Sequence, residues 1–156
     1  MTPLHDDRPA DAPASGRFVG TEHRFPLRVY FEDTDLSGVV YHANYLRFME
    51  RARSDMLRVA GIDQRTHFEA TGDAYVVADL AIRYRAPAKL DDALVVVTRV
   101  EAVRAASVAI QQTVSRGRTI LTEGRVVAAL VAADGRPRRQ PESWVRAFRD
   151  LVQQGA

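Results

Sequence analysis

The sequence predicts an α+β fold in which one antiparallel sheet packs against a single long helix. From Phe25 onward apolar and polar residues alternate, which is the period of a half-buried strand. After the polar loop 33–38, apolar residues recur at helical spacing over about 18 residues, and Gly61 stands where a helix cap is expected. The links 105–106 and 116–118 are hairpin-sized, so the strands that they join should be antiparallel neighbours. The remaining expected elements are four strands and a terminal helix, over residues 74–85, 93–104, 107–115, 119–133 and 141–154.

The expected domain spans residues 24–154 and follows a disordered N-terminal tail over residues 1–23. The tail carries prolines among Asp, Ala, Ser and Gly, and it has too little apolar material to offset the cost of ordering it. His5 and His23 fall in this tail and are given no role. A chain of 156 residues can bury a core without a disulfide or a metal. The absence of Cys excludes disulfides, thiolate nucleophiles and Cys-ligated metal clusters.

The charge pattern does not favour a nucleic-acid partner, because the formal net charge is only +2 and the arginines are scattered among nearly as many acidic residues. No apolar run approaches the length of a membrane-spanning helix, and the N-terminus does not have the pattern of a signal peptide. We therefore expect a cytoplasmic protein without a transmembrane segment. One long helix covers only one face of a sheet, so a second subunit should bury the other face or the sheet edge. At least a homodimer is expected.

The densest polar cluster lies at the junction of strand and helix, over residues 32–45. It combines carboxylates at the end of a strand, a glycine that permits a tight turn, and a helix N-terminus with unpaired amides. Those amides could stabilise a carbonyl oxygen that gains charge in a tetrahedral transition state. A carboxylate such as Asp35 could attack that carbonyl or deprotonate a water, and His42 could orient the water. Spacing alone does not choose between Asp33 and Asp35.

The string from Arg28 to Leu57, RVYFEDTDLSGVVYHANYLRFMERARSDML, resembles the hotdog-fold acyl-CoA thioesterases of the 4-hydroxybenzoyl-CoA thioesterase and YbgC-like group. Weaker resemblance continues through the string YRAPA, residues 84–88, to about residue 149. The positions that carry the resemblance are Asp35, Gly38, Val39, Val40, Tyr41, His42, Asn44 and Tyr45, followed by Glu50-Arg51-Ala52-Arg53.

This resemblance implies a sheet wrapped around a central helix, a homodimer or homotetramer with sites at the subunit interface, and hydrolysis of an acyl thioester. The thioester would be one of coenzyme A or of acyl carrier protein, and no cofactor and no metal are expected. The family motif places the catalytic carboxylate on Asp35 and a direct role on His42, and it leaves Asp33 structural. Whether Asp35 is a nucleophile or a general base stays open. The expected substrate contacts are Gly38, Val39, Val40, Tyr41, Asn44 and Tyr45.

A polar stripe on the long helix is interpreted as a solvated surface. Its members are Arg47, Arg51, Ser54 and Arg58. Glu50 and Asp55 stand three or four positions from these arginines, where ion pairs form along a helix. The alternative is a contact with coenzyme A phosphates or an acidic carrier protein, since guanidinium groups suit phosphate geometry. Lys89, Arg116 and Arg118 are comparable phosphate candidates.

Three other functions compete with thioester hydrolysis. The string DTDLS imitates the motif of haloacid dehalogenase-like phosphatases, but the antiparallel C-terminal half does not supply the parallel sheet of that fold. The His-Phe-Pro-Gly type of motif of hotdog dehydratases is missing, because His67-Phe68 continues with Glu69-Ala70. The remaining alternative is a non-catalytic protein that binds acyl-CoA or acyl carrier protein thioesters.

Overall fold

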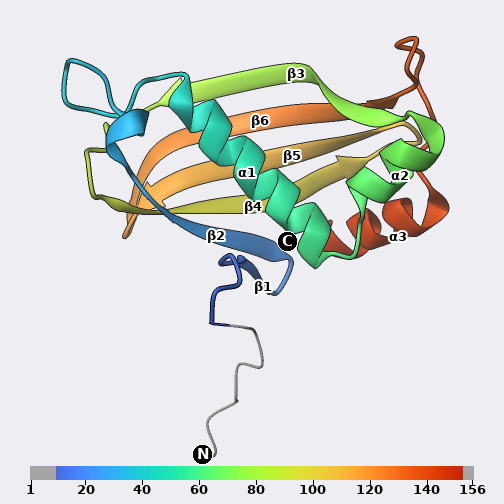
Figure 1. Cartoon of the computed structure of the whole chain (residues 1–156), viewed down its shortest axis with the longest axis horizontal. Helices are drawn as coiled ribbons and strands as arrows, with labels where there is room; N and C mark the ends of the chain where they lie inside the picture. Colours follow the sequence, from blue (N-terminus) through green and yellow to red (C-terminus); the bar gives the residue numbers. More distant parts are fainter. Residues whose placement is uncertain (1–9, 153–156) are drawn as a thin grey trace, which may run out of the picture.

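The computed structural model describes residues 10–152, which contain one six-stranded antiparallel sheet and three α-helices (Figure 1). The strand order is β1-β2-β4-β5-β6-β3. The predicted α+β arrangement is confirmed, and the strands joined by the two short links are antiparallel neighbours. The elements are β1 Arg17–Val19, β2 Glu22–Arg28, a 3-10 turn Phe31–Asp33, α1 Asn44–Val59, α2 Gln64–Thr71, β3 Ala74–Tyr84, β4 Ala93–Val103, β5 Ser107–Arg116, β6 Thr119–Val131 and α3 Glu142–Leu151.

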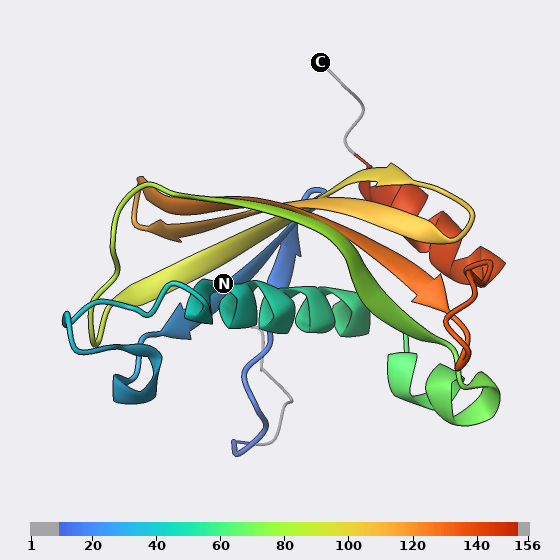
Figure 2. The ribbon, with the colours of Figure 1, turned by 90° about the horizontal axis from the view of Figure 1, so that it is seen from above.

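Helix α1 lies across one face of the sheet, which curves over it (Figure 2). Its apolar stripe is buried, as the helical spacing predicts: Phe48, Met49, Ala52 and Met56 are almost inaccessible to solvent. Burial of each of the large side chains contributes roughly 1.5–3 kcal/mol. A Cβ on Gly124 of β6 would lie only 3.1 Å from Cε of Met49. The missing side chain at Gly124 therefore lets the helix approach the sheet closely.

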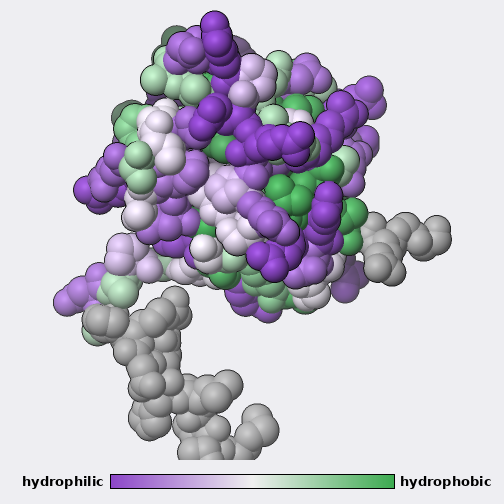
Figure 3. All heavy atoms as spheres, turned by 90° about the vertical axis from the view of Figure 1, so that its right-hand side faces the viewer, coloured by the Kyte–Doolittle hydropathy of each residue, from purple (hydrophilic) through white to green (hydrophobic). Residues whose placement is uncertain are grey.

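The two shorter helices lie at the end of the sheet beyond the last turn of α1 (Figure 1). Trp144 and Phe148 of α3 join Met56 of α1 in a second core cluster. Helix α2 was not predicted, because none of its residues is buried and it therefore has no apolar stripe. Its first turn is held locally, since the Asp63 side chain accepts the N–H of Thr66 at 3.0 Å. The surface at this end is mostly hydrophilic, with smaller hydrophobic areas between (Figure 3).

The predicted tail is wrong for residues 17–23, which belong to the sheet. Strand β1 pairs with β2, and β2 pairs with β4 from His23 to Arg28. His23 is fully buried, although no sequence pattern places it in the core. The segment is ordered by backbone pairing and by contacts with α1, and neither of these shows in its apolar content. Residues 1–9, which include His5, and residues 153–156 lie outside the described residues.

Candidate active site

The loop before α1 folds back on itself, and this places Asp35 near the start of the helix. The Tyr41 N–H donates to the Asp33 carbonyl at 2.9 Å, and the Asp35 N–H donates to the Val39 carbonyl at 3.1 Å. At the tip, the Gly38 N–H donates to the Asp35 carbonyl at 3.0 Å, with φ of Gly38 at +82°. A residue with a Cβ rarely adopts this conformation, so Gly38 makes the turn possible.

The structure separates the two candidate carboxylates that spacing could not distinguish. Asp33 is buried, and its Oδ2 accepts the Tyr30 N–H at 2.8 Å. Its Oδ1 accepts the side-chain N–H of Asn44 at 2.6 Å. Asp33 therefore ties the loop to the first residue of α1, a purely structural contact. Asp35, in contrast, is exposed.

The Asp35 carboxylate is held in its ionised form by its own loop. Its Oδ1 accepts the Ser37 N–H at 2.9 Å and also accepts the Ser37 hydroxyl. These bonds, first from the hydroxyl and then from the amide, lower the pKa of Asp35, and the nearby His42 imidazole lowers it further. Among residues 10–152, Oδ2 of Asp35 has no hydrogen-bond partner. One carboxylate oxygen is thus available for a substrate or a water.

The start of α1 offers free amides beside this carboxylate. The residue before the helix is Ala43, which has no side chain that caps the helix, and the first turn carries no acidic residue. Within the described chain, the N–H groups of His42 and Ala43 donate to no acceptor. Unpaired N–H groups and the positive end of the helix dipole favour an oxygen that gains negative charge. The sequence predicts that this carboxylate and these amides act together, and that role stays a prediction.

A shallow recess opens next to this helix start. Its lining residues are Val40, His42, Tyr45, Tyr84, Arg85, Ala86 and Pro87. The Tyr45 hydroxyl accepts the Ala88 N–H at 3.0 Å, which joins the helix to the link between β3 and β4. The exposed His42 ring packs edge-on against Tyr41, with centroids 4.6 Å apart.

The predicted substrate contacts do not all face the solvent. Gly38 and Tyr41 are exposed and Val39 is partly buried, whereas Val40, Asn44 and Tyr45 are buried. Asn44 is occupied by Asp33, so its role is to fix the loop. No sequence pattern indicates a role for Tyr84, although the YRAPA string that carries part of the resemblance begins with it. Tyr84 reaches the site because β3 ends beside the helix start.

The structure also corrects the interpretation of the charged residues. Asp55, expected to pair with Arg51 or Arg58 along α1, is buried and bonds to His23 instead. Arg116, a phosphate candidate, pairs with Asp92 at 2.8 Å and donates to the Pro87 carbonyl at 3.2 Å.

Within residues 10–152, no group of three or more His, Asp and Glu side chains is arranged to hold a metal ion. No helix in that range is both long enough and apolar enough to span a bilayer.

The thioesterase superfamily model matches residues 37–123. The chain belongs to the thioesterase superfamily. It is 44% identical over 128 residues to the acyl-CoA thioesterase YbgC of Haemophilus influenzae, covering 81% of this chain and 94% of that protein. It is 41% identical over 131 residues to the acyl-CoA thioester hydrolase YbgC of Escherichia coli, covering 83% of this chain and 97% of that protein.

A solved structure agrees with the sequence matches. The crystal structure of a probable thioesterase from Bartonella henselae superimposes with a TM-score of 0.74 at 38% identity, covering 77% of this chain and 99% of that one. The fold is the predicted hotdog fold, an antiparallel sheet around one long helix.

Proposed function

We propose that this protein hydrolyses acyl-CoA thioesters to the free acid and coenzyme A. The observation that carries the proposal is the exposed, ionised Asp35 beside the free amides at the start of α1. The names of the relatives from Haemophilus influenzae and Escherichia coli support the same reaction. The alternative, a protein that binds acyl thioesters without cleaving them, would have no use for a carboxylate held ionised with one oxygen free.

In the proposed reaction the thioester carbonyl oxygen accepts hydrogen bonds from the N–H groups of His42 and Ala43. These donors stabilise the negative charge that the oxygen gains in the tetrahedral transition state. Oδ2 of Asp35 either takes a proton from a water that attacks the carbonyl carbon, or attacks that carbon itself to form a mixed anhydride that water then cleaves. The C–S bond breaks in either case, and coenzyme A leaves as a thiolate that then takes up a proton.

The test is thiol release from a panel of acyl-CoAs by the wild-type protein and by Asp35→Asn. This substitution keeps the shape of the side chain and removes the charge that either role needs, so kcat should fall at least about a hundredfold. Asp63→Asn is a matched control, because Asp63 is also exposed and has a pKa lowered by a neighbouring hydroxyl residue, Thr66. Its activity should equal that of the wild type. Undiminished turnover in Asp35→Asn would remove Asp35 from the mechanism.

The same panel separates hydrolysis from binding alone. A wild-type protein that binds acyl-CoA but releases no thiol from any acyl-CoA or acyl carrier protein thioester would be a binding protein. A single turnover in ¹⁸O-water then distinguishes the two roles of Asp35. A general base leaves the label only in the product acid, whereas attack by Asp35 can leave it in the carboxylate.

We also propose that a second copy of the chain pairs along β3. Within the described sheet, β3 is an edge strand that pairs only with β6. Four of its large apolar side chains are substantially exposed: Val76, Val77, Leu80 and Tyr84. A long apolar edge strand is usually covered by another chain. Sedimentation of the wild type and of Leu80→Lys tests this: the wild type should sediment as a homodimer or homotetramer, and the variant as a smaller species.

The cytoplasmic location and the use of acyl carrier protein thioesters stay predictions.

A further inference from the structure

Tyr84 reaches the proposed site from a strand that lies far from the catalytic loop in sequence. It is the last residue of β3, and its hydroxyl donates to the His42 carbonyl at 2.7 Å. The residue is 44% exposed, so it contributes much less to the core than a buried tyrosine would. Its ring belongs to the apolar edge of β3 that a second copy would cover, but packing of the ring does not require the bond from its hydroxyl to the His42 carbonyl.

Aromatic contacts hold the Tyr84 ring in place at the helix start. The ring lies edge-on to Tyr45, with centroids 5.5 Å apart at an angle of 69°. It also lies edge-on to the His42 ring, at 6.4 Å and 82°. Tyr45 is itself fixed, because it is buried and its hydroxyl accepts the Ala88 N–H. The phenol of Tyr84 therefore has a rigid support on the helix.

The bond from Tyr84 acts on the peptide unit that carries one of the free amides. The carbonyl of His42 and the N–H of Ala43 belong to the same planar peptide. The helix does not use this carbonyl, because the first-turn N–H of Leu46 donates to Ala43 at 3.2 Å instead. Within the described residues, Tyr84 is the only donor to it. A hydrogen bond to the carbonyl fixes the plane of the peptide and strengthens the donor at its other end.

We propose that Tyr84 is a positioning residue that holds the His42–Ala43 peptide with its N–H directed at the thioester carbonyl. This inference rests on the proposed thioesterase function. Tyr84 itself does not touch the reacting atoms in this role and transfers no proton. It acts through the amide, which gains most when the carbonyl oxygen becomes charged in the transition state.

The chain offers a matched control on the same strand. Tyr75, near the other end of β3, donates its hydroxyl to Oε1 of Gln140 and packs against Trp144. Tyr75→Phe and Tyr84→Phe thus each remove one phenolic hydrogen bond from one strand, and only Tyr84 lies at the helix start. Tyr75→Phe should lower the stability and leave kcat unchanged.

The experiment measures kcat and KM for both variants with the acyl-CoA that the wild type cleaves best. Tyr84→Phe should lower kcat about fivefold to tenfold, the value of one hydrogen bond, with KM changed less than twofold. An interaction made only in the transition state lowers kcat and kcat/KM equally. Because no proton moves, the pH at which kcat is half-maximal should stay that of the wild type.

Three results would overturn the positioning role. They are a kcat of Tyr84→Phe within twofold of the wild type, a change confined to KM, and a displaced pH profile, which would indicate proton transfer by the phenol. Circular dichroism and the urea midpoint show that the compared variants are folded. If the wild type itself releases no thiol, the proposed function fails and the role of Tyr84 fails with it. If the wild type is active and kcat of Tyr84→Phe is unchanged, only the positioning role is refuted.

Discussion

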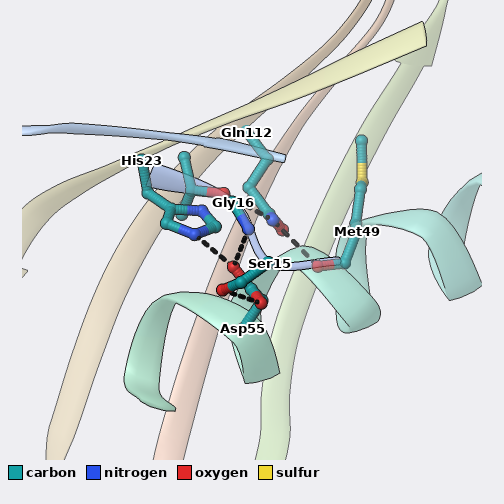
Figure 4. A network of polar contacts seen from close by, with 7 residues as sticks. Ser15, Gly16, His23, Met49, Asp55 and Gln112 are labelled. Atoms are coloured by element: carbon teal, nitrogen blue, oxygen red, sulfur yellow. Dashed lines mark hydrogen bonds and ion pairs between the residues drawn. The ribbon is translucent and has the colours of Figure 1, made fainter. Parts of the chain in front are cut away.

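Asp35, in the loop before α1, and Asp55, within α1, accept the same kinds of hydrogen bond but lie in opposite environments. Each accepts a serine hydroxyl and a backbone N–H. Asp35 takes both from Ser37, two residues away, and is exposed. Asp55 is buried, and its donors are far away in sequence: the Ser15 hydroxyl at 3.0 Å, the Gly16 N–H at 2.8 Å and Nε2 of His23 at 2.7 Å (Figure 4).

The two carboxylates differ in whether an oxygen remains without a hydrogen-bond partner in the described chain. Oδ2 of Asp35 is free within the described chain, so a substrate or a water can use it. Both oxygens of Asp55 are occupied, and the result is an anchor that fastens β1 and β2 to α1. A carboxylate can serve chemistry only where its partners leave one oxygen accessible. A similar set of donors thus leaves one carboxylate oxygen accessible at Asp35 and occupies both oxygens at Asp55.

The largest expected contrast comes from removing each charge in turn. Asp35→Asn should abolish most of the activity and leave the urea midpoint almost unchanged, because its side chain is exposed. Asp55→Asn should lower the free energy of unfolding by about 2–3 kcal/mol, since buried donors lose their charged acceptor. Its activity per folded molecule should stay within twofold of the wild type. Equal losses of activity in both variants would contradict the division between the two sites.

Gly16→Ala should weaken the Asp55 anchor without changing any hydrogen-bonding group. A Cβ at this position would lie 2.8 Å from Oδ2 of Asp55 and 2.8 Å from Nε2 of His23, and it would also meet the Arg24 carbonyl. The crowding should cost about 1–3 kcal/mol of unfolding free energy. Urea denaturation followed by Trp144 fluorescence measures this loss. An unchanged midpoint would mean that the segment adapts without strain.

The anchor should also make stability depend on pH through His23. Burial lowers the pKa of His23, and this outweighs the hydrogen bond and charge of Asp55, which raise it. Below the unfolded value of about 6.5 the unfolded chain takes up a proton that folded His23 resists. The free energy of unfolding should therefore fall as the pH drops below that value, until the lower folded pKa is passed. Denaturation curves from pH 8 to pH 5 should show that the free energy of unfolding depends less on pH in His23→Asn than in the wild type. An identical dependence would refute the role of His23.

The smallest expected effect is a change in the pKa of Asp35. Ser37→Ala removes the hydroxyl that contributes most to the lowered pKa of Asp35 and keeps the backbone N–H. The pKa of Asp35 should rise, so the acid limb of the pH profile of kcat/KM should move to higher pH, with little change near pH 8. Ser15→Ala, which removes the hydroxyl at Asp55, should leave the profile in place. A profile that moves equally in both variants would break the comparison.

The two sites also differ in how much of each the sequence could predict. The Asp35 loop is local: Gly38, Ser37 and the start of the helix all lie within ten residues, so the sequence brings them together whatever the rest of the fold does. The Asp55 anchor joins residues 32–40 positions apart. No pattern in the segment 15–23 indicates its order, because its order comes from a partner on α1. For the same reason, spacing along α1 predicts that Asp55 pairs with Arg51 or Arg58, whereas its partners come from residues 15–23.

The sequence by itself determined the elements and the chemistry that depend on near neighbours. These are the period-2 strands, the apolar stripe of α1, the two hairpin links and the choice of the 32–45 junction as the site. Only the tertiary structure decided how the strands pair outside the two hairpins. It also decided the burial of His23 and the bond from Tyr84 to the helix start. The physical reason is range: periodicity and turn chemistry act over a few residues, whereas the end of β3 reaches the start of α1 only after the sheet has closed around the helix.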